Sequence, residues 1–247
     1  MTTPVDWFTA FPIQPATEAV EALRQAWSEL AARPRPDFNE KTKETALTKR
    51  LKVYVENYTA RQRGLLGMWA AEDISGEIDP ATGKLVERRT DIVYGWNNDI
   101  QDLKLVFEFK RLGRQKRHRD HYLRDRGLGR FVTGMYSRQQ AVAAMVGVLL
   151  DPEPEVVPAI RKALANGALA TALRLRSTPA GEPFARPSTL FAAADFDTEH
   201  ERDPALAPAH GTIRVSHFFL AFGYPTTTAK PKEAQATSLR RSAVNTV

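Results

Sequence analysis

The sequence contains no cysteine, so disulfide bonds, thiolate-bound zinc and cysteine nucleophiles are excluded. It also lacks any run of eighteen apolar residues, and its start, MTTPVDWFTAFPIQP, has neither the basic residues nor the continuous apolar stretch of a secretion signal. We therefore expect a cytoplasmic protein that makes no contact with a membrane. Any metal that it binds must sit on oxygen or imidazole ligands.

Several catalytic motifs are missing as well. There is no G-x-S-x-G elbow, no P-loop and no paired-glycine dinucleotide fingerprint, which argues against a serine hydrolase, an NTPase and a nicotinamide enzyme. The five histidines do not have the spacing of a zinc motif such as H-E-x-x-H. Each is interpreted as an ordinary core or surface histidine, with His200 the one to examine in a structure.

The composition is that of an ordinary globular protein, with 43% hydrophobic and 26% charged residues in a chain of 247. This length is enough for one sizeable core, and we expect a single domain over residues 1–224. Residues 225–247 have almost no large apolar side chain, which predicts a disordered tail.

Positive charge is concentrated in one segment. The chain has 35 Lys and Arg against 29 Asp and Glu, a formal charge of +6, which favours polyanionic partners. Many of these cations lie in LKLVFEFKRLGRQKRHRDHYLRDRGLGR, residues 103–130, where they could contact a phosphate backbone. The alternative is a solvated helix face without a nucleic-acid partner.

Two helices are predicted near the start of the chain. Residues 17–32 carry apolar side chains at intervals of three and four. A second helix is predicted to begin at Asn39, an N-cap candidate. In that helix Glu44 lies on the same stripe as Leu47 and Leu51, so its carboxylate can face inward.

The strongest strand signal is LKLVFEFKRL, in which apolar and mostly polar positions alternate with a period of two. It follows LVERRTDIVYGW and an Asn-Asn-Asp turn, which predicts a hairpin, and a cationic helix is expected from about Gln115. We also expect strands in AVAAMVGVLLD, ALATALRLR, LFAAA and GTIRVSHFFLAF, and a helix over 154–170.

Three residues of this hairpin suggest phosphodiester hydrolysis. Asp91 and Glu108 are separated by sixteen residues, the distance expected across one hairpin, so both carboxylates can point to one face. Lys110 projects from the same face as Glu108. Carboxylates hold the divalent cation that such hydrolysis uses, and a lysine can orient the attacking water or stabilise the transition state. A cross-strand ion pair of purely structural function is the alternative.

Through Thr90-Asp91 and Glu108-Phe109-Lys110, the chain resembles the PD-(D/E)xK or restriction-endonuclease-like nucleases. The resemblance covers roughly residues 39–150 and implies an α/β fold, in which a mixed four-stranded sheet is flanked by helices in the order αβββαβ. Our expectation adds an N-terminal helix and a C-terminal extension of strand and loop. Thr90 stands where the family's motif has proline.

The resemblance also implies roles for individual residues. It makes Asp91 and Glu108 ligands of Mg²⁺, with Mn²⁺ as an alternative, and Lys110 a catalytic residue. Because the family's first helix often contributes a further acidic residue, we assign this role to Glu44, with Glu40 as the rival. Some relatives add a glutamine and a tyrosine on the next helix, but Gln115 and Tyr122 do not have the usual spacing.

The sequence thus predicts a metal-dependent nuclease, with DNA as the expected substrate and a homodimer as one expected assembly. A softer resemblance to uncharacterised bacterial proteins suggests a phage-defence or mobile-element context. The alternatives are a catalytically inactive nuclease-like module that binds nucleic acid or a partner protein, and a protein without any nucleic-acid function. Trp69, Trp96 and Tyr136 could stack on bases, although core packing is the default for such residues.

Overall fold

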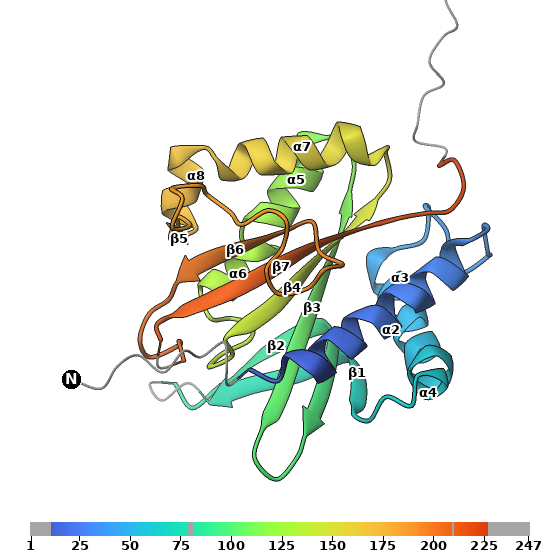
Figure 1. Ribbon diagram of the computed structural model, residues 1–247, viewed down its shortest axis with the longest axis horizontal. Coiled ribbons are helices and arrows are strands. Elements are labelled where there is room, and N and C mark those ends of the chain that lie inside the picture. Colours follow the sequence, from blue (N-terminus) through green and yellow to red (C-terminus); the bar gives the residue numbers. More distant parts are fainter. Residues whose placement is uncertain (1–10, 79–81, 209, 227–247) are drawn as a thin grey trace, which may run out of the picture.

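The computed structural model describes residues 11–78, 82–208 and 210–226, and its centre is a mixed seven-stranded β-sheet (Figure 1). The strands lie in the order β1-β2-β3-β4-β7-β6-β5. Pairing is parallel from β3 through β4 to β7 and antiparallel elsewhere. The bounds are β1 Met68–Ile78, β2 Leu85–Asn97, β3 Asp102–Leu112, β4 Val142–Leu149, β5 Leu175–Arg176, β6 Phe196–Glu201 and β7 Thr212–Ala221.

Helices cover both faces of this sheet, which confirms the predicted α/β class. One face is covered by α2 (Ile13–Ala31), α3 (Glu44–Tyr54), the π-helical turn η1 (Val55–Thr59) and α4 (Ala60–Gln62). The other face is covered by α5 (Lys116–Leu123), α6 (Leu128–Val132), α7 (Glu153–Leu164) and α8 (Gly167–Ala172). Each face therefore has its own apolar core, and the sheet lies between the two.

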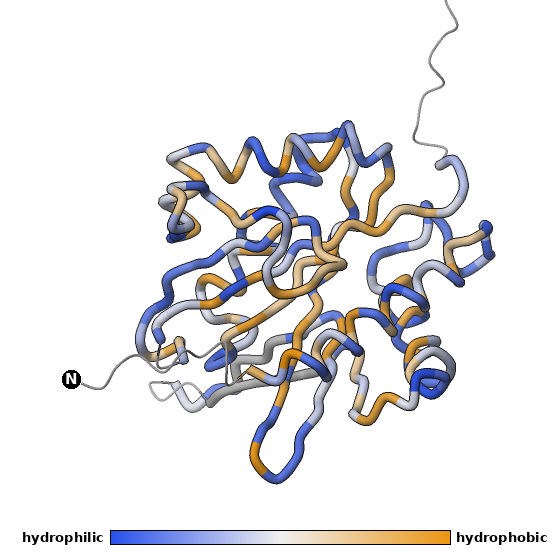
Figure 2. The backbone as a smooth tube through the Cα atoms, in the orientation of Figure 1, coloured by the Kyte–Doolittle hydropathy of each residue, from blue (hydrophilic) through white to orange (hydrophobic). Residues whose placement is uncertain are grey.

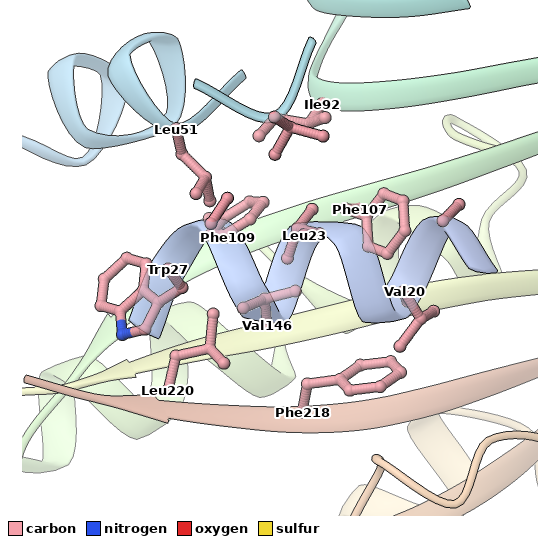
Figure 3. Packing of buried hydrophobic residues seen from close by; sticks show 14 of the residues in the cluster. Val20, Leu23, Trp27, Leu51, Ile92, Phe107, Phe109, Val146, Phe218 and Leu220 are labelled. Atoms are coloured by element: carbon pink, nitrogen blue, oxygen red, sulfur yellow. The ribbon is translucent and has the colours of Figure 1, made fainter. Parts of the chain in front are cut away.

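Helix α2 packs closely on the centre of the sheet because much of its inner face is alanine. Ala19, Ala22 and Ala26 are fully buried and leave little distance between the helix and the strands. Larger side chains of the helix, such as Leu23 and Trp27, lie among residues of the strands (Figure 3). The labelled partners on β2, β3, β4 and β7 are Ile92, Phe107, Phe109, Val146, Phe218 and Leu220.

The predicted strand in AVAAMVGVLLD is confirmed as β4, and all eight of its residues are buried. A parallel strand that is covered on both faces needs no polar alternation, which is why its sequence alone did not separate strand from helix. In Figure 2 the central strands are largely hydrophobic, whereas α7 alternates along its length between hydrophobic and hydrophilic residues.

The helix predicted from Asn39 begins five residues later, at Glu44. The reason is that Asn39 caps a tight turn instead of the helix. Its side-chain oxygen accepts a 2.9 Å hydrogen bond from the amide of Lys41, and its side-chain nitrogen donates a 2.7 Å bond to the carbonyl of Arg35. Glu44 is thus the first residue of α3, near the positive end of the helix dipole.

Of two strand predictions in the C-terminal part, that for ALATALRLR holds only for its last two residues and that for LFAAA is wrong. In ALATALRLR the chain forms α8, because the side chain of Asn166 accepts hydrogen bonds from the amides of Ala168 and Leu169 and starts a new helix. Only Leu175–Arg176 pair as a strand. LFAAA is a turn, and the strand begins after it at Phe196.

The terminal strand in GTIRVSHFFLAF is confirmed as β7. Of the predicted tail, residues 227–247 lie outside the described residues. No helix within the described ranges is long and apolar enough to cross a membrane.

Candidate active site

Strands β2 and β3 part at one end of their hairpin, and the residues predicted to be catalytic lie at this fork. The last pair before the fork is Ile92 with Phe107. Beyond it β2 remains paired with β1, and β3 continues as the partner of β4. Asp91 and Glu108 are the first residues past that last pair, one on each strand. The sheet therefore opens at the position of the two carboxylates.

Two carboxylates replace the missing strand as hydrogen-bond acceptors for β3. Asp91 Oδ2 accepts a 2.8 Å hydrogen bond from the amide of Phe109. Glu44 Oε2, at the start of α3, accepts a 3.0 Å bond from the amide of Arg111. Main-chain groups of an interior strand need partners, so these bonds stabilise the fork and fix both carboxylates beside it.

The amine of Lys110 lies among the oxygen atoms of the fork. Its Nζ is 2.8 Å from Glu44 Oε1, 2.8 Å from Glu108 Oε1 and 3.9 Å from Asp91 Oδ2. It also donates a 2.5 Å hydrogen bond to the carbonyl oxygen of Phe109. The structure thus brings together Glu44, Asp91, Glu108 and Lys110, all four of the residues that the sequence singled out.

Burial is graded across this cluster. The side chain of Glu108 is 1% exposed, that of Asp91 16% and that of Glu44 28%, so the cluster runs from the protein interior to solvent. Glu108 Oε2 is buried and has no hydrogen-bond partner in the described part of the chain. A buried carboxylate oxygen without a donor is costly unless a proton or a cation satisfies it.

The environment raises the pKa values of both strand carboxyls. Burial, with the nearby charge of Asp91, raises the pKa of Glu108 to about 8, against the opposing effect of Lys110. Burial also raises the pKa of Asp91, although Lys110 and the Phe109 amide act in the other direction. Perturbed carboxyls at one opening in a sheet are typical of functional sites.

Lys110 remains a cation in this environment. Burial alone lowers the pKa of its amine, but the charges of Glu108, Asp91 and Glu44 outweigh it and hold the pKa above the usual range. At neutral pH the ammonium can donate hydrogen bonds and stabilise negative charge, but it cannot remove a proton from water.

Two further side chains reach the cluster from the segment after α5. Arg130 of α6 places Nη1 3.6 Å from Glu108 Oε1 and also donates a hydrogen bond to the hydroxyl of Tyr136. In the sequence Arg130 is only one of the cations of the basic segment, and Tyr136 is expected to be a core or stacking residue. No periodic pattern or motif connects these two residues with Glu108, and only the fold brings them together.

Other candidates lie elsewhere. The carboxylate of Glu40 lies near the hydroxyl of Tyr224, at 3.3 Å, so Glu44 is the helix carboxylate that contacts Lys110. Gln115 is the N-cap residue of α5. The hydroxyl of Tyr122 is buried at 2.9 Å from Nδ1 of His217.

His200 belongs to the same buried network as Tyr122. Its Nε2 is 2.8 Å from Oγ1 of Thr198, which is 2.9 Å from Nε2 of His217. Burial lowers the pKa of His200 to about 4 and that of His217 well below its usual value. Both histidines are therefore neutral and pack in the core rather than in the fork.

The donor set of the fork suits a hard divalent cation. In the described residues no group of three or more His, Asp or Glu side chains is placed so that it could hold a metal ion. Asp91, Glu108 and the Phe109 carbonyl nevertheless present oxygen atoms around the position of the Lys110 ammonium. Mg²⁺ prefers such ligands and retains several waters, so two carboxylates and a carbonyl are sufficient.

Comparison with known proteins gives no relatives. No protein-family model, no curated protein and no solved structure matches this chain.

Proposed function

We propose that this protein is a metal-dependent nuclease of the PD-(D/E)xK superfamily that hydrolyses phosphodiester bonds in DNA. The observation that carries the proposal is the fork between β2 and β3, where the ammonium of Lys110 lies among the carboxylates of Asp91, Glu108 and Glu44. Two strand carboxylates and a lysine at an opening in a sheet can hold a cation and a phosphate side by side.

The arrangement of the surrounding elements supports the superfamily assignment. From α3 to β4 the chain runs α3, β1, β2, β3, α5 with the short α6, and β4, in the αβββαβ order that the resemblance implies. These four strands are neighbours in the sheet, with β4 parallel to β3. The remaining strands β7, β6 and β5 extend the sheet beyond β4 and form the expected C-terminal extension.

Asp91 and Glu108 are the proposed ligands of Mg²⁺ or Mn²⁺. The buried Oε2 of Glu108 is available for this role, and a ligand bond satisfies it. When bound, the cation supplies charge neutralisation and lowers the pKa of water. Asp91 would bind the cation through its other oxygen while Oδ2 still accepts the hydrogen bond from the Phe109 amide.

Lys110 acts as a donor of positive charge. Since it stays protonated, it orients the attacking water or a phosphate oxygen by hydrogen bonding and stabilises the negative charge of the transition state. Glu44 acts through Lys110: its Oε1 holds the ammonium while its Oε2 is fixed by the Arg111 amide. Glu44 is therefore a positioning residue.

DNA is the proposed polyanion because exposed cations lie on and next to α5, close in sequence to β3. These cations are Arg114, Lys116, Arg117, Arg124 and Arg126. Some of them already pair with acidic neighbours, as Lys116 does with Asp120 at 2.8 Å. Exposed pairs of this kind are weak and exchange readily for phosphate contacts, which predicts binding that weakens as salt rises.

The test is cleavage of supercoiled plasmid and of single-stranded DNA by the purified protein with Mg²⁺ or Mn²⁺. Lys110→Ala and an EDTA control are run in parallel, with folding of the variant checked by circular dichroism. Cleavage by the wild type alone supports the proposal. If DNA is bound but never cut, the protein is a nucleic-acid-binding module; if DNA is neither bound nor cut, the proposal is wrong in both parts.

A further inference from the structure

We infer that Arg130 is a catalytic residue of this site, whose guanidinium binds a non-bridging oxygen of the scissile phosphate, and that Tyr136 and Arg202 position it. The inference rests on the proposed nuclease function and adds a residue to it. Arg130 then contacts the phosphate that is cut, whereas the exposed cations of α5 contact phosphates that are not cut.

The guanidinium of Arg130 lies at the solvent side of the buried carboxylate. Its Nη1 is 3.6 Å from Glu108 Oε1, which is an ion-pair distance but too long for a hydrogen bond. Its Nη2 makes no hydrogen bond to any residue that the structure describes, and 31% of the side chain is exposed. Arg130 thus offers unused donors beside the proposed metal ligand.

Tyr136 fixes the direction of this guanidinium. The tyrosine hydroxyl accepts a hydrogen bond from Arg130 Nη1 and donates one of 2.6 Å to the carbonyl of Arg89 on β2. The Arg130 Cζ also lies 5.2 Å from the centre of the tyrosine ring, a cation–π distance. A guanidinium held by both contacts is oriented before the phosphate arrives, as transition-state stabilisation requires.

A buried arginine fixes the segment that carries both residues. Arg202, at the end of β6, donates hydrogen bonds to the carbonyls of Phe131 (2.8 Å), Tyr136 (2.7 Å) and Ser137 (2.7 Å). In the described part of the chain it has no carboxylate partner, and burial lowers its pKa to about 10, so it is still charged at neutral pH. Its charge is used to hold the main chain around Arg130.

The turn before α6 is also specific. A Cβ on Gly127 would overlap the carbonyl oxygens of His121 and Tyr122 at the end of α5. Only glycine lets the chain turn back against α5 and direct the first turn of α6 towards the fork. Gly127 is therefore required by the close approach of this turn to α5.

The alternative interpretation is that Arg130 is only a counterion of Glu108 and does not contact the phosphate. The two readings predict different effects of removing it. A counterion competes with the metal for the carboxylate, so its loss leaves metal binding as tight or tighter and leaves the rate at saturating metal unchanged. A phosphate ligand stabilises the transition state, so its loss slows cleavage even when metal and DNA are saturating.

The experiment compares Arg130→Ala, Arg130→Lys and Tyr136→Phe with Arg33→Ala, a matched control from the exposed turn after α2. Single-turnover cleavage is measured at saturating DNA and Mn²⁺. Mn²⁺ affinity is measured separately by calorimetry without DNA, and thermal unfolding shows whether each variant is folded.

We expect Arg130→Ala to lower the single-turnover rate about a hundredfold, the effect of losing one preorganised donor, without weaker Mn²⁺ binding. Arg130→Lys recovers part of the rate, and added guanidinium chloride restores part of it to Arg130→Ala. Tyr136→Phe keeps the ring but loses the hydroxyl, so its rate falls about tenfold. Arg33→Ala cuts at the wild-type rate.

A folded Arg130→Ala protein that cuts at the wild-type rate at saturation overturns this inference while the nuclease proposal stands. The inference is also overturned if the cleavage rate of Arg130→Ala falls only in proportion to a loss of Mn²⁺ affinity. A wild-type protein that cuts no DNA overturns both proposals.

Discussion

The amide of Phe109 donates a 2.8 Å hydrogen bond to Oδ2 of Asp91, across the point where β2 and β3 separate. One carboxylate thus closes an open end of the sheet and also faces the proposed metal position. The two functions need different chemistry, because an amide oxygen can accept the hydrogen bond but cannot supply the negative charge that a divalent cation requires.

Asp91→Asn separates these two functions. The asparagine oxygen still accepts the Phe109 amide, so we expect the free energy of unfolding to change by about 1 kcal/mol or less. We expect the affinity for the metal to fall at least about tenfold, because a loss of this size is typical even when the residue removed only hydrogen-bonds to a metal ligand. Calorimetric titration with Mn²⁺ measures this, and Asp102→Asn, an exposed residue at the start of β3, is the matched control. Equal affinity of Asp91→Asn and wild type would contradict the assignment of Asp91.

The two acidic residues near the start of α3 should differ in their effect on cleavage. In Glu44→Gln the amide oxygen still accepts one hydrogen bond, but the charge that holds the Lys110 ammonium at 2.8 Å is lost. We expect cleavage to slow by about ten- to a hundredfold. Glu40→Gln, whose carboxylate lies near Tyr224, keeps nearly the wild-type rate.

The measurement is the initial rate of plasmid cleavage at saturating Mg²⁺. Because Glu44 acts through Lys110, the double variant Glu44→Gln, Lys110→Ala should be no slower than Lys110→Ala alone. Additive losses would show that Glu44 contributes independently of the lysine.

The raised pKa of Glu108 predicts that the metal-free protein loses stability as pH rises from about 6.5 to about 8. In this range the folded state keeps a proton on Glu108 that the unfolded state has released, so the free energy of unfolding falls with pH, by up to about 1.4 kcal/mol per unit. The titration of His200 and His217 changes the free energy of unfolding in the opposite direction, because the pKa values of both are lowered in the folded state. This effect is confined to pH values below about 6.5.

Urea unfolding across this pH range tests the prediction. Glu108→Gln has no carboxyl to ionise, so its stability should be nearly independent of pH between 6.5 and 8 and should exceed that of the wild type at pH 8. Added Mg²⁺ should stabilise the wild type most at the upper end, where the carboxylate is free of its proton. Parallel pH profiles for wild type and variant would mean that Glu108 is not the group responsible.

The sequence was sufficient for those parts of the site that depend on regular periodicity. The alternation in β3 placed Glu108 and Lys110 on one face, the hairpin spacing placed Asp91 opposite them, and helical spacing turned Glu44 inward even though α3 begins later than predicted. These inferences need only the local geometry of a strand or a helix.

Arg130, Tyr136 and Arg202 could not be found in this way. They lie on a five-residue helix, in the turn after it and at the end of β6, and their approach depends on how β6 packs beyond β4 and β7. No repeat in the sequence encodes such a contact. The failed part of the strand prediction in ALATALRLR has a similar origin, since the side chain of Asn166 decides the local structure there.

Arg202 leads to a prediction about stability that is independent of the reaction. Its guanidinium satisfies three buried carbonyls in the segment 131–137, and a lysine has one nitrogen and cannot reach all of them. Arg202→Lys should therefore lower the free energy of unfolding by about 2 to 4 kcal/mol, since each acceptor left without a donor costs about 1 to 3 kcal/mol. Denaturant unfolding measures this loss, with Arg176→Lys, an exposed arginine on β5, as the matched control.

Arg202→Lys also tests whether the C-terminal extension affects the geometry of the fork. At a temperature where Arg202→Lys is still folded, a loosened 131–137 segment lets Arg130 move relative to Glu108, so single-turnover cleavage should slow while Mn²⁺ affinity stays within about twofold. A variant that is destabilised as expected but cuts at the wild-type rate would show that Arg202 holds the segment only for stability. In that case the geometry of Arg130 must be maintained by Tyr136 alone, and Tyr136→Phe should then carry the whole loss of rate.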